Sequence, residues 1–355
     1  MSNDPVVITG GAGFIGSNLA GRLLSQGRRV IVFDNLSRPG VEVNLDWLRT
    51  TYSTRVEFLQ ADVRDGAAVR HAVDRASAVF HLAAQTAVTS SLTDPLYDFE
   101  VNARGALNVL EAIRRRGAHV PLLFTSTNKV YGNLNHVPVH RTGNRYEPLD
   151  EDVRLHGASE DMPLQFHSPY GCSKGAADQY VLDYSKSYGL PVTVFRMSCI
   201  YGPHQFGTED QGWVAHFLIR ALNRRPITLY GDGLQVRDLL FVEDLVDAFL
   251  LAISHMDSLA GSAFNIGGGP ANVMSLLELL NKIGDDLGER PSIRFEDWRA
   301  ADQKYYVSDT RRFQAATGWR TRVSISEGLT RLRSWLLEES NLITEPTPVH
   351  GGAAA

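Results

Sequence analysis

The chain has 355 residues, of which 43% are hydrophobic and 21% are charged, and its formal net charge is −5. These values are ordinary for a soluble α/β protein of one large domain, or of a large and a smaller one, and they give no reason to expect binding to nucleic acid or acidic membranes. Two cysteines, Cys172 and Cys199, are too few for a disulfide framework and favour the reducing cytoplasm, and we expect neither a membrane span, a secretory signal nor a metal site.

The first predicted strand leads into a glycine-rich turn. Pro5–Thr9 is a short, β-branched apolar run of the kind found in buried parallel strands. Gly10, Gly13 and Gly16 follow it at a regular spacing, before a helical pattern over Ser17–Gln26. Such glycines allow a tight turn and close approach of a pyrophosphate, which then faces the positive end of the helix dipole. The stretch therefore predicts a dinucleotide-binding turn.

The second predicted strand, Arg29–Phe33, ends at Asp34, 18 residues after Gly16. A carboxylate near this position binds the adenosine ribose hydroxyls and repels a 2′-phosphate. The spacing therefore favours NAD over NADP, although Arg38 lies close by in the sequence. The alternative interpretation of Asp34 is an ordinary turn or cap residue.

Strands and helices continue to alternate after this unit. Val56–Gln60 and Ala78–Gln85 are predicted as strands three and four, the latter ending in a turn of small residues that would pass under the cofactor. Leu96–Arg116 is predicted as one long amphipathic helix, Val120–Thr125 as strand five and Pro191–Arg196 as strand six. These repeated units predict a Rossmann-type, doubly wound parallel sheet, with ligands at the carboxyl ends of its strands.

Candidate catalytic residues follow strand five. A hydroxyl in the segment that begins at Ser126 would lie at the carboxyl edge of the sheet, and the long polar stretch 133–167 is expected to cover the pocket. Ser168 and Pro169 are the residue types of a helix cap and a first helical position.

On the helix that starts there, Tyr170 and Lys174 are four residues apart and share one face. The pKa of tyrosine is about 10 in water, which is too high for a base at neutral pH. A nearby ammonium and a cationic nicotinamide ring would lower it, so that the pair could remove a proton from a sugar alcohol while hydride leaves the same carbon. Taken alone, such a pair also occurs on polar surface helices.

The regular alternation ends at about Tyr201, where a smaller C-terminal substrate-binding lobe is predicted to begin. Segments without clear periodicity separate its short strands and helices: 205–213, 231–238 and 297–306. We predict three parts: a Rossmann domain over 1–200, the second lobe over 201–338 with some chain returning to the first, and a disordered tail over 339–355.

Several motifs occur in an order that is more specific than any one of them. They are Thr-Gly-Gly-Ala-Gly-Phe-Ile-Gly from Thr9, His-Leu-Ala-Ala from His81, Val-Tyr-Gly from Val130, Tyr170-x-x-x-Lys174, Tyr-Gly-Pro from Tyr201 and Val-Arg-Asp from Val236. With them the chain resembles extended short-chain dehydrogenases/reductases, and more narrowly the nucleotide-sugar epimerases among them, from Val6 to about Leu337.

The resemblance implies bound NAD, a homodimer or homotetramer, and catalysis by Thr127, Tyr170 and Lys174. Thr127 would hydrogen-bond the reacting oxygen, Tyr170 would remove its proton, and Lys174 would lower the pKa of Tyr170 and hold the nicotinamide ribose. The implied cofactor-binding residues are Gly10, Gly13, Phe14, Ile15, Gly16, Asp34, Asn35, Asp62, Val63, Leu82, Ala83, Ala84, Gln85, Asn102, Thr125, Tyr170 and Lys174. The implied substrate-binding residues are Gln85, Thr127, Asn128, His167, Gln211, Val214, Arg237 for the diphosphate, and Asp302 for the nucleotide ribose.

Two segments, 126–132 and 167–180, resemble the branch of the family that converts CDP-paratose to CDP-tyvelose at C2 through a transient 2-keto sugar; related enzymes supply O-antigen sugars. The stretch 210–214 and Asp302-Gln303 point the same way. A UDP-galactose or UDP-glucuronate 4-epimerase would use the same catalytic residues and is the alternative. A 4,6-dehydratase is less favoured, because such enzymes carry Asp-Glu where this chain has Asn128-Lys129, and an inactive NAD-binding module is a further alternative.

Overall fold

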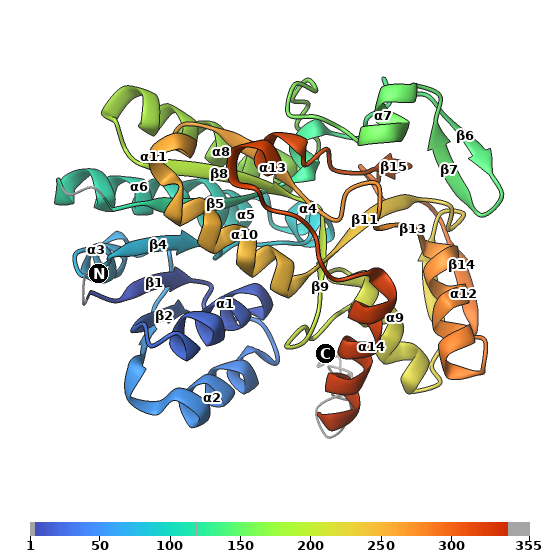
Figure 1. Ribbon diagram of the computed structural model, residues 1–355, viewed down its shortest axis with the longest axis horizontal. Helices are drawn as coiled ribbons and strands as arrows, with labels where there is room; N and C mark the ends of the chain where they lie inside the picture. The colour runs from blue at the N-terminus through green and yellow to red at the C-terminus, as the bar shows by residue number, and fades with distance from the viewer. Residues whose placement is uncertain (1–3, 118–119, 340–355) are drawn as a thin grey trace, which may run out of the picture.

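Parallel strands form the central sheet of the larger lobe (Figure 1). The structure is a computed structural model and describes residues 4–117 and 120–339, so the predicted tail after Glu339 lies outside the described residues. The seven strands run in the order β12-β8-β5-β4-β1-β2-β3, and every neighbouring pair is parallel. They are β1 (Val6–Thr9), β2 (Val30–Asp34), β3 (Val56–Gln60), β4 (Ala78–His81), β5 (Leu122–Thr127), β8 (Val192–Met197) and β12 (Ala263–Ile266). The predicted Rossmann-type doubly wound sheet is confirmed.

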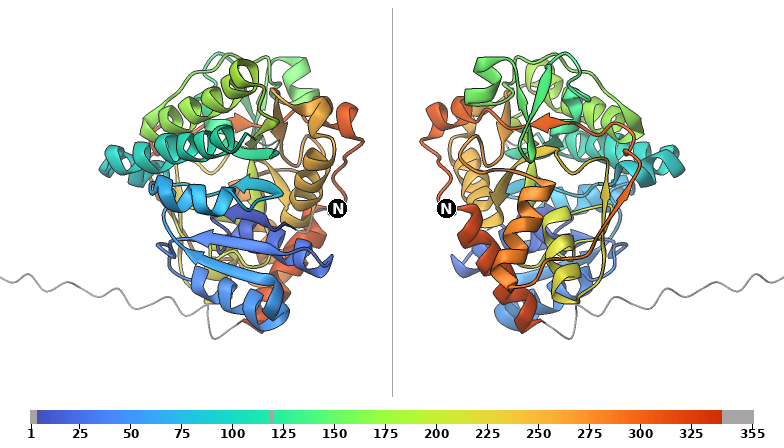
Figure 2. Two further views of the ribbon diagram at one scale, coloured as in Figure 1. Left: turned by 90° about the vertical axis from the view of Figure 1, so that its left-hand side faces the viewer. Right: turned by 90° about the vertical axis from the view of Figure 1, so that its right-hand side faces the viewer.

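Two helix layers cover the sheet, because alternate side chains of each strand face opposite sides. Val6 and Ile8 pack with one layer, whereas Val7 between them packs with the other. The first layer contains α1 (Phe14–Ser25), α2 (Val41–Tyr52), α10 (Val242–Ser254), α11 (Met256–Leu259) and α13 (Arg311–Thr317). The second contains α3 (Gly66–Val73), α6 (Gly105–Arg116) and α8 (Ser168–Tyr188). Figure 2 shows both layers edge-on.

The helix predicted over Leu96–Arg116 is not one regular helix. The short α4 (Val88–Thr93) precedes α5 (Pro95–Phe99), and a π-helical turn, Glu100–Arg104, joins α5 to α6. Such wider turns are uncommon in proteins, and those that occur are often found at functional sites. Here the turn brings Asn102 into the interior, where only 1% of it is exposed.

The stretch 133–167 does not cover the cavity, contrary to the prediction. It forms a hairpin, β6 (Val139–Thr142) and β7 (Arg145–Pro148), followed by α7 (Glu151–His156). Val153 of α7 packs against Tyr305 and Val236 of the second lobe, and Arg145 binds Glu278 there through two hydrogen bonds of 2.7 Å. The few apolar residues that make this contact are isolated among polar ones, so their periodicity gave no sign of it.

The second lobe is built from short strands and three helices. Its strands are β9 (Cys199–Tyr201), β10 (Ile227–Tyr230), β11 (Val236–Phe241), β13 (Val273–Ser275), β14 (Ile293–Glu296) and β15 (Tyr305–Tyr306), and its helices are α9 (Trp213–Leu222), α12 (Leu276–Leu287) and α14 (Ile325–Glu338). Two segments predicted without strands contain them: β11 begins inside 231–238, and β15 lies inside 297–306. The same part of the chain returns β12, α10, α11 and α13 to the larger lobe.

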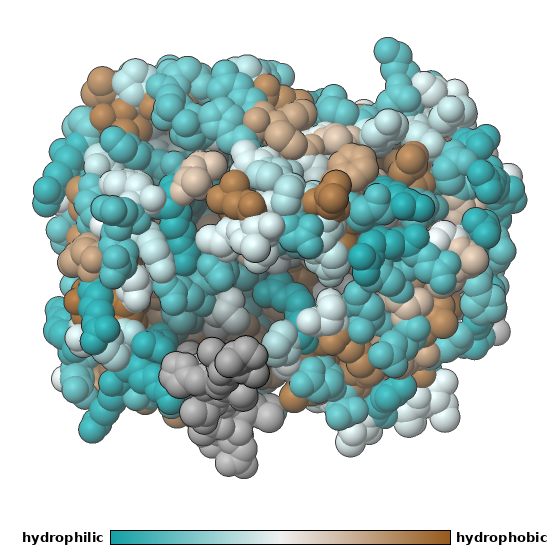
Figure 3. Space-filling model, turned by 180° about the vertical axis from the view of Figure 1, so that it is seen from behind, coloured by the Kyte–Doolittle hydropathy of each residue, from teal (hydrophilic) through white to brown (hydrophobic). Residues whose placement is uncertain are grey.

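The outer surface carries no broad apolar band in the rear view, where hydrophobic residues occur in small groups among hydrophilic ones (Figure 3). None of the helices in the described part of the chain is long and apolar enough to cross a membrane.

Candidate active site

A cavity of about 670 Å³ lies across the carboxyl ends of the strands, between the two lobes. One side is formed by the turn after β1 and by the ends of β2, β4 and β5, and the other by the chain around Gln211, by β10 and β11, and by Arg299 and Asp302. In doubly wound sheets this is where ligands bind, because the chain leaves the central strands in opposite directions and opens a crevice there.

The glycine turn leaves no room for side chains. A Cβ on Gly16 would lie 2.2 Å from the carbonyl oxygen of Gly10, and Gly10 itself has a φ of +69°. Helix α1 begins directly after Gly13, earlier than predicted, and no side chain caps it. The free N–H groups of its first turn therefore suit a bound phosphate.

Asp34 stands at the end of β2 beside this turn. Its carboxylate accepts hydrogen bonds from the backbone N–H groups of Ala12, at 3.1 Å, and Leu36, at 2.9 Å. Burial raises the pKa of Asp34, and these backbone N–H groups counteract part of that rise. A fixed acceptor next to a phosphate-binding turn fits the ribose of a dinucleotide.

Most of the predicted cofactor residues line the cavity. They are Gly10, Gly13, Phe14, Ile15, Gly16, Asp34, Asn35, Asp62, Val63, Leu82, Ala83, Ala84, Thr125, Tyr170 and Lys174. Gln85 and Asn102 do not line it, contrary to the prediction. The backbone N–H of Gln85 donates to Oδ1 of Asn102 at 3.0 Å, so this pair holds the cavity wall from behind.

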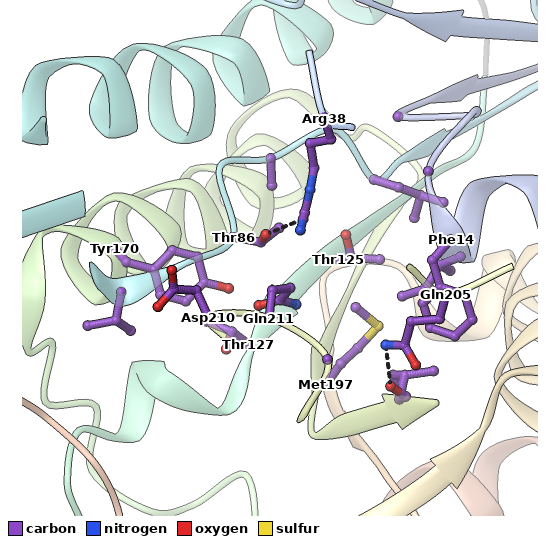
Figure 4. A pocket seen from close by; sticks show the side chains of 18 of the residues that line it. Phe14, Arg38, Thr86, Thr125, Thr127, Tyr170, Met197, Gln205, Asp210 and Gln211 are labelled. Atoms are coloured by element: carbon purple, nitrogen blue, oxygen red, sulfur yellow. Dashed lines mark hydrogen bonds between the residues drawn. The ribbon is translucent and has the colours of Figure 1, made fainter. Parts of the chain in front are cut away.

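The end of β5 and the start of α8 bring Thr127 and Tyr170 together. Ser168, predicted as the cap, is instead the first residue of α8, with a φ of +65°, and its hydroxyl accepts a hydrogen bond from the N–H of Gly171 within the first turn. Tyr170 then faces the cavity beside Thr127, whose hydroxyl opposes part of the rise that burial causes in the pKa of Tyr170. Figure 4 shows the two side chains next to each other at the cavity wall.

Lys174 lies one turn further along α8 but does not lower the pKa of Tyr170 in the described structure. Its Nζ donates to the carbonyl oxygen of Thr125 at 2.6 Å and lies 4.4 Å from the ring centre of Phe124. Burial lowers the pKa of Lys174 to about 8 and raises that of Tyr170 to about 12. The chain by itself therefore disfavours the phenolate, and the lowering of this pKa by Lys174 together with the nicotinamide ring stays a prediction.

A buried polar cluster behind α8 was missed by the sequence analysis. Asp98 is fully buried and accepts hydrogen bonds from the Ser173 hydroxyl and from Nδ2 of Asn102, the latter at 3.1 Å. Burial raises the pKa of Asp98. Asp98 and Asn102 are four residues apart, and Ser173 immediately precedes Lys174, but a pattern on two separate helices gives no sign that they meet.

The part of the cavity formed by the second lobe contains a compact charge cluster. Arg237 is 7% exposed and binds Asp302 at 2.7 Å, so it is neither a surface residue nor paired with its sequence neighbour. Lys129 donates to the carbonyl oxygen of Ala301 at 3.1 Å and lies 3.7 Å from Asp302. Burial opposes the ionisation of Asp302, but the charges of Arg237 and Lys129 outweigh it and lower its pKa.

The predicted substrate residues divide into two groups. Thr127, Asn128, Gln211, Val214, Arg237 and Asp302 line the cavity. Gln85 and His167 do not, and His167 is exposed outside it, at the residue before α8.

Sequence reasoning did not assign Arg299 to the cavity. Its guanidinium lies 3.9 Å from the ring centre of Tyr230 and donates to the carbonyl oxygen of Glu209 at 3.1 Å. It also lies 3.4 Å from a carboxylate oxygen of Asp210. No motif marked Arg299, because it lies in a segment without regular periodicity.

Comparison with known proteins places these features in context. The model of the NAD-dependent epimerase/dehydratase family matches residues 6–267. The chain is 42% identical to the CDP-paratose 2-epimerase of Salmonella typhi over 93% of this chain and 98% of that protein. It is also similar to the UDP-glucose 4-epimerase of Thermus thermophilus in complex with NAD, at 33% identity and a TM-score of 0.77, over 94% of this chain and 99% of that one. DesIV, the dTDP-glucose 4,6-dehydratase of Streptomyces venezuelae solved with NAD, is 28% identical, with a TM-score of 0.81, over 95% of this chain and 98% of that one.

Proposed function

The chain belongs to the NAD-dependent epimerase/dehydratase family, and we propose that it converts CDP-paratose to CDP-tyvelose by inverting the configuration at C2 of the sugar. The observation that carries the proposal is the placement of Tyr170 and Thr127 side by side in one cavity with the glycine turn and Arg237. The similarity to the Salmonella CDP-paratose 2-epimerase along nearly the whole chain supports the choice of sugar.

The protein's part in the reaction is to hold the sugar and to move one proton. NAD, when bound, would accept and return a hydride, and the positive charge of its oxidised ring would favour the phenolate of Tyr170. Tyr170 Oη takes the proton from the 2-hydroxyl group and later gives it back. Thr127 is close enough to Tyr170 to donate a hydrogen bond to the same sugar oxygen.

Inversion requires the 2-keto sugar to present its other face before hydride returns. The nucleotide must stay bound while the sugar turns, and Arg237 and Arg299 supply guanidinium groups for its diphosphate on the far side of the cavity. The proton and the hydride both return to the substrate, so the reaction is redox-neutral.

Water elimination is disfavoured by the two residues after Thr127. The amide of Asn128 donates to Oε1 of Gln303 at 3.1 Å, and Lys129 points to Ala301, so neither residue offers a carboxylic acid to a leaving hydroxyl group. A 4-epimerase acting on a UDP-sugar is the second candidate. The similarity to the Thermus UDP-glucose 4-epimerase favours it, and the pair Tyr170–Thr127 would serve it equally well.

A substrate panel tests the proposal. We expect kcat/KM for CDP-paratose to exceed that for UDP-galactose and UDP-glucuronate at least about a hundredfold, because a site built for one base and one sugar leaves polar groups unpaired with another. Higher activity on either UDP-sugar would replace the proposal with the 4-epimerase. The variant Tyr170→Phe, which retains the ring but not the hydroxyl, should be inactive on every member of the panel.

A homodimer or homotetramer and a cytoplasmic location remain predictions from the sequence. Sedimentation of the purified protein tests the first, and cell fractionation tests the second.

A further inference from the structure

Arg38 reaches across the cofactor half of the cavity. It lies in the loop after β2, and its Nη1 donates a hydrogen bond of 2.7 Å to Oγ1 of Thr86, in the loop after β4. Because β1 lies between β2 and β4 in the sheet, this contact crosses the carboxyl end of β1, where the glycine turn begins. Figure 4 shows Arg38 pointing into the cavity toward Thr86, between Tyr170 and Phe14.

Arg38 also differs from the other cavity arginines in its charge environment. Arg237 is paired with Asp302 at 2.7 Å, and Arg299 with Asp210 at 3.4 Å. In residues 4–117 and 120–339, no carboxylate lies within ion-pair distance of Arg38, whose hydrogen-bond partner is the neutral hydroxyl of Thr86. Arg38 is exposed in the open cavity, although the surrounding chain removes enough of its hydration to lower its pKa. A cation without a carboxylate partner, held over a turn that suits a phosphate, is available to bind an anion.

We propose that Arg38 binds the diphosphate of the cofactor from the side opposite the glycine turn and thereby retains the cofactor, with Thr86 as its positioning residue. A guanidinium suits this role, because it forms strong charge-assisted hydrogen bonds with phosphate oxygens. The side chain extends from the β2 loop over β1 toward β4, away from Asp34 and the ribose position there. Arg38 is therefore directed at the diphosphate and not at a 2′-phosphate, which removes the argument for NADP that its sequence position raised.

Retention has a direct use in this family's chemistry. The hydride taken from the sugar must return to the same sugar, so a cofactor that leaves between the two transfers strands an oxidised sugar and a reduced cofactor. A contact that closes over the diphosphate slows that loss without touching the reacting atoms.

The test measures cofactor release, which is independent of the sugar that the enzyme uses. The full-length protein loaded with NAD is diluted, and the release rate is followed for the wild type, Arg38→Gln, Thr86→Val and the control Arg49→Gln. Arg49 is exposed on α2 and stacks on Phe58, so its replacement removes one positive charge without reaching the cavity. We expect release from Arg38→Gln to be about tenfold to a hundredfold faster, and from Thr86→Val about threefold to tenfold faster.

Competition with fragments locates the contact. Arg38→Gln should weaken the binding of ADP-ribose, which carries the diphosphate, and leave that of adenosine unchanged, and added salt should reduce the difference between wild type and variant. Three results would overturn the proposal. The first is release of NAD from Arg38→Gln at the wild-type rate. The second is equally weakened binding of ADP-ribose and adenosine, which would indicate a purely structural loop contact, and the third is a selective loss of NADP binding, which would assign Arg38 to a 2′-phosphate.

Discussion

Burial shifts the pKa values of Tyr170 and Lys174 in opposite directions. It raises the pKa of Tyr170 to about 12 and lowers that of Lys174 to about 8, so at neutral pH the chain alone keeps the phenol protonated and the ammonium charged. In the mechanism that we propose, the positive charge that favours the phenolate comes with the oxidised cofactor.

This makes the ionisation of Tyr170 dependent on NAD. In protein stripped of cofactor, we expect the tyrosinate absorbance that distinguishes wild type from Tyr170→Phe to develop only at strongly alkaline pH, near 12. Saturation with NAD should shift that difference signal to lower pH by at least about one unit, because an adjacent opposite charge favours the ionised form. An unchanged titration with NAD would contradict this account of proton removal.

Lys174 should reduce stability at neutral pH, because its pKa in the folded protein lies below the ordinary value of 10.5. Between pH 8 and pH 10.5 the folded protein has lost a proton that the unfolded chain retains, so this residue makes the protein more stable as pH rises through that window. We expect Lys174→Met to raise the free energy of unfolding at pH 7 by about 2 kcal/mol, after allowance for the lost hydrogen bond to Thr125, and to abolish activity.

Denaturant unfolding at several pH values measures this effect. Lys186→Met, on the exposed face of the same helix, is the control and should change stability by less than about 0.5 kcal/mol. A Lys174→Met protein that is less stable than the wild type at pH 7 would contradict the claim that the buried charge of Lys174 reduces stability.

At the scale of elements, the segment 95–116 and helix α8 are joined by buried polar contacts. Nδ2 of Asn102 lies 3.1 Å from acceptor oxygens on Gln85, Asp98 and Ser173, which belong to three different segments. These contacts fix the position from which α8 presents Tyr170 and Lys174.

Removing that connection should destabilise the protein. We expect Asn102→Ala to lower the free energy of unfolding by about 2–4 kcal/mol, because it leaves several buried polar groups unpaired. Thr93→Ala, which removes an exposed hydrogen bond of 3.4 Å on α4, provides the comparison and should change stability by less than about 0.5 kcal/mol. Urea unfolding of both variants measures the effect. An Asn102→Ala protein that loses no more stability than Thr93→Ala would contradict this role of Asn102.

The sequence predicted well the features that depend on a few adjacent residues. The Ser168-Pro169 start of α8 and the glycine turn depend on the conformations of adjacent residues, which the sequence determines directly. The inward direction of Asn102 depends on a π-helical turn, and the packing of 133–167 depends on contacts with the second lobe, so neither could be derived from periodicity. Arg299 was missed as a site residue for the same reason, and the sequence showed Arg38 only as a neighbour of Asp34, because the contact of Arg38 with Thr86 exists only in the folded chain.

At the scale of the whole molecule, the two lobes have separate tasks at one cavity. The larger lobe contributes the glycine turn, Asp34 and the pair Tyr170–Thr127 to its lining, and the smaller lobe contributes Arg237, Arg299 and Asp302, which we propose bind the nucleotide sugar. On this division, a change of substrate would require changes in only one wall of the cavity.

The central claim is that hydride leaves C2 of CDP-paratose and returns to C2 with the opposite configuration, using NAD that the protein carries. Its most direct test is ¹H NMR of the purified protein with CDP-paratose that carries deuterium at C2, in ordinary water and without added NAD. The account predicts CDP-tyvelose with deuterium still at C2. Loss of deuterium to solvent would contradict hydride return, and no conversion by folded protein after NAD is added would contradict the assignment of the substrate.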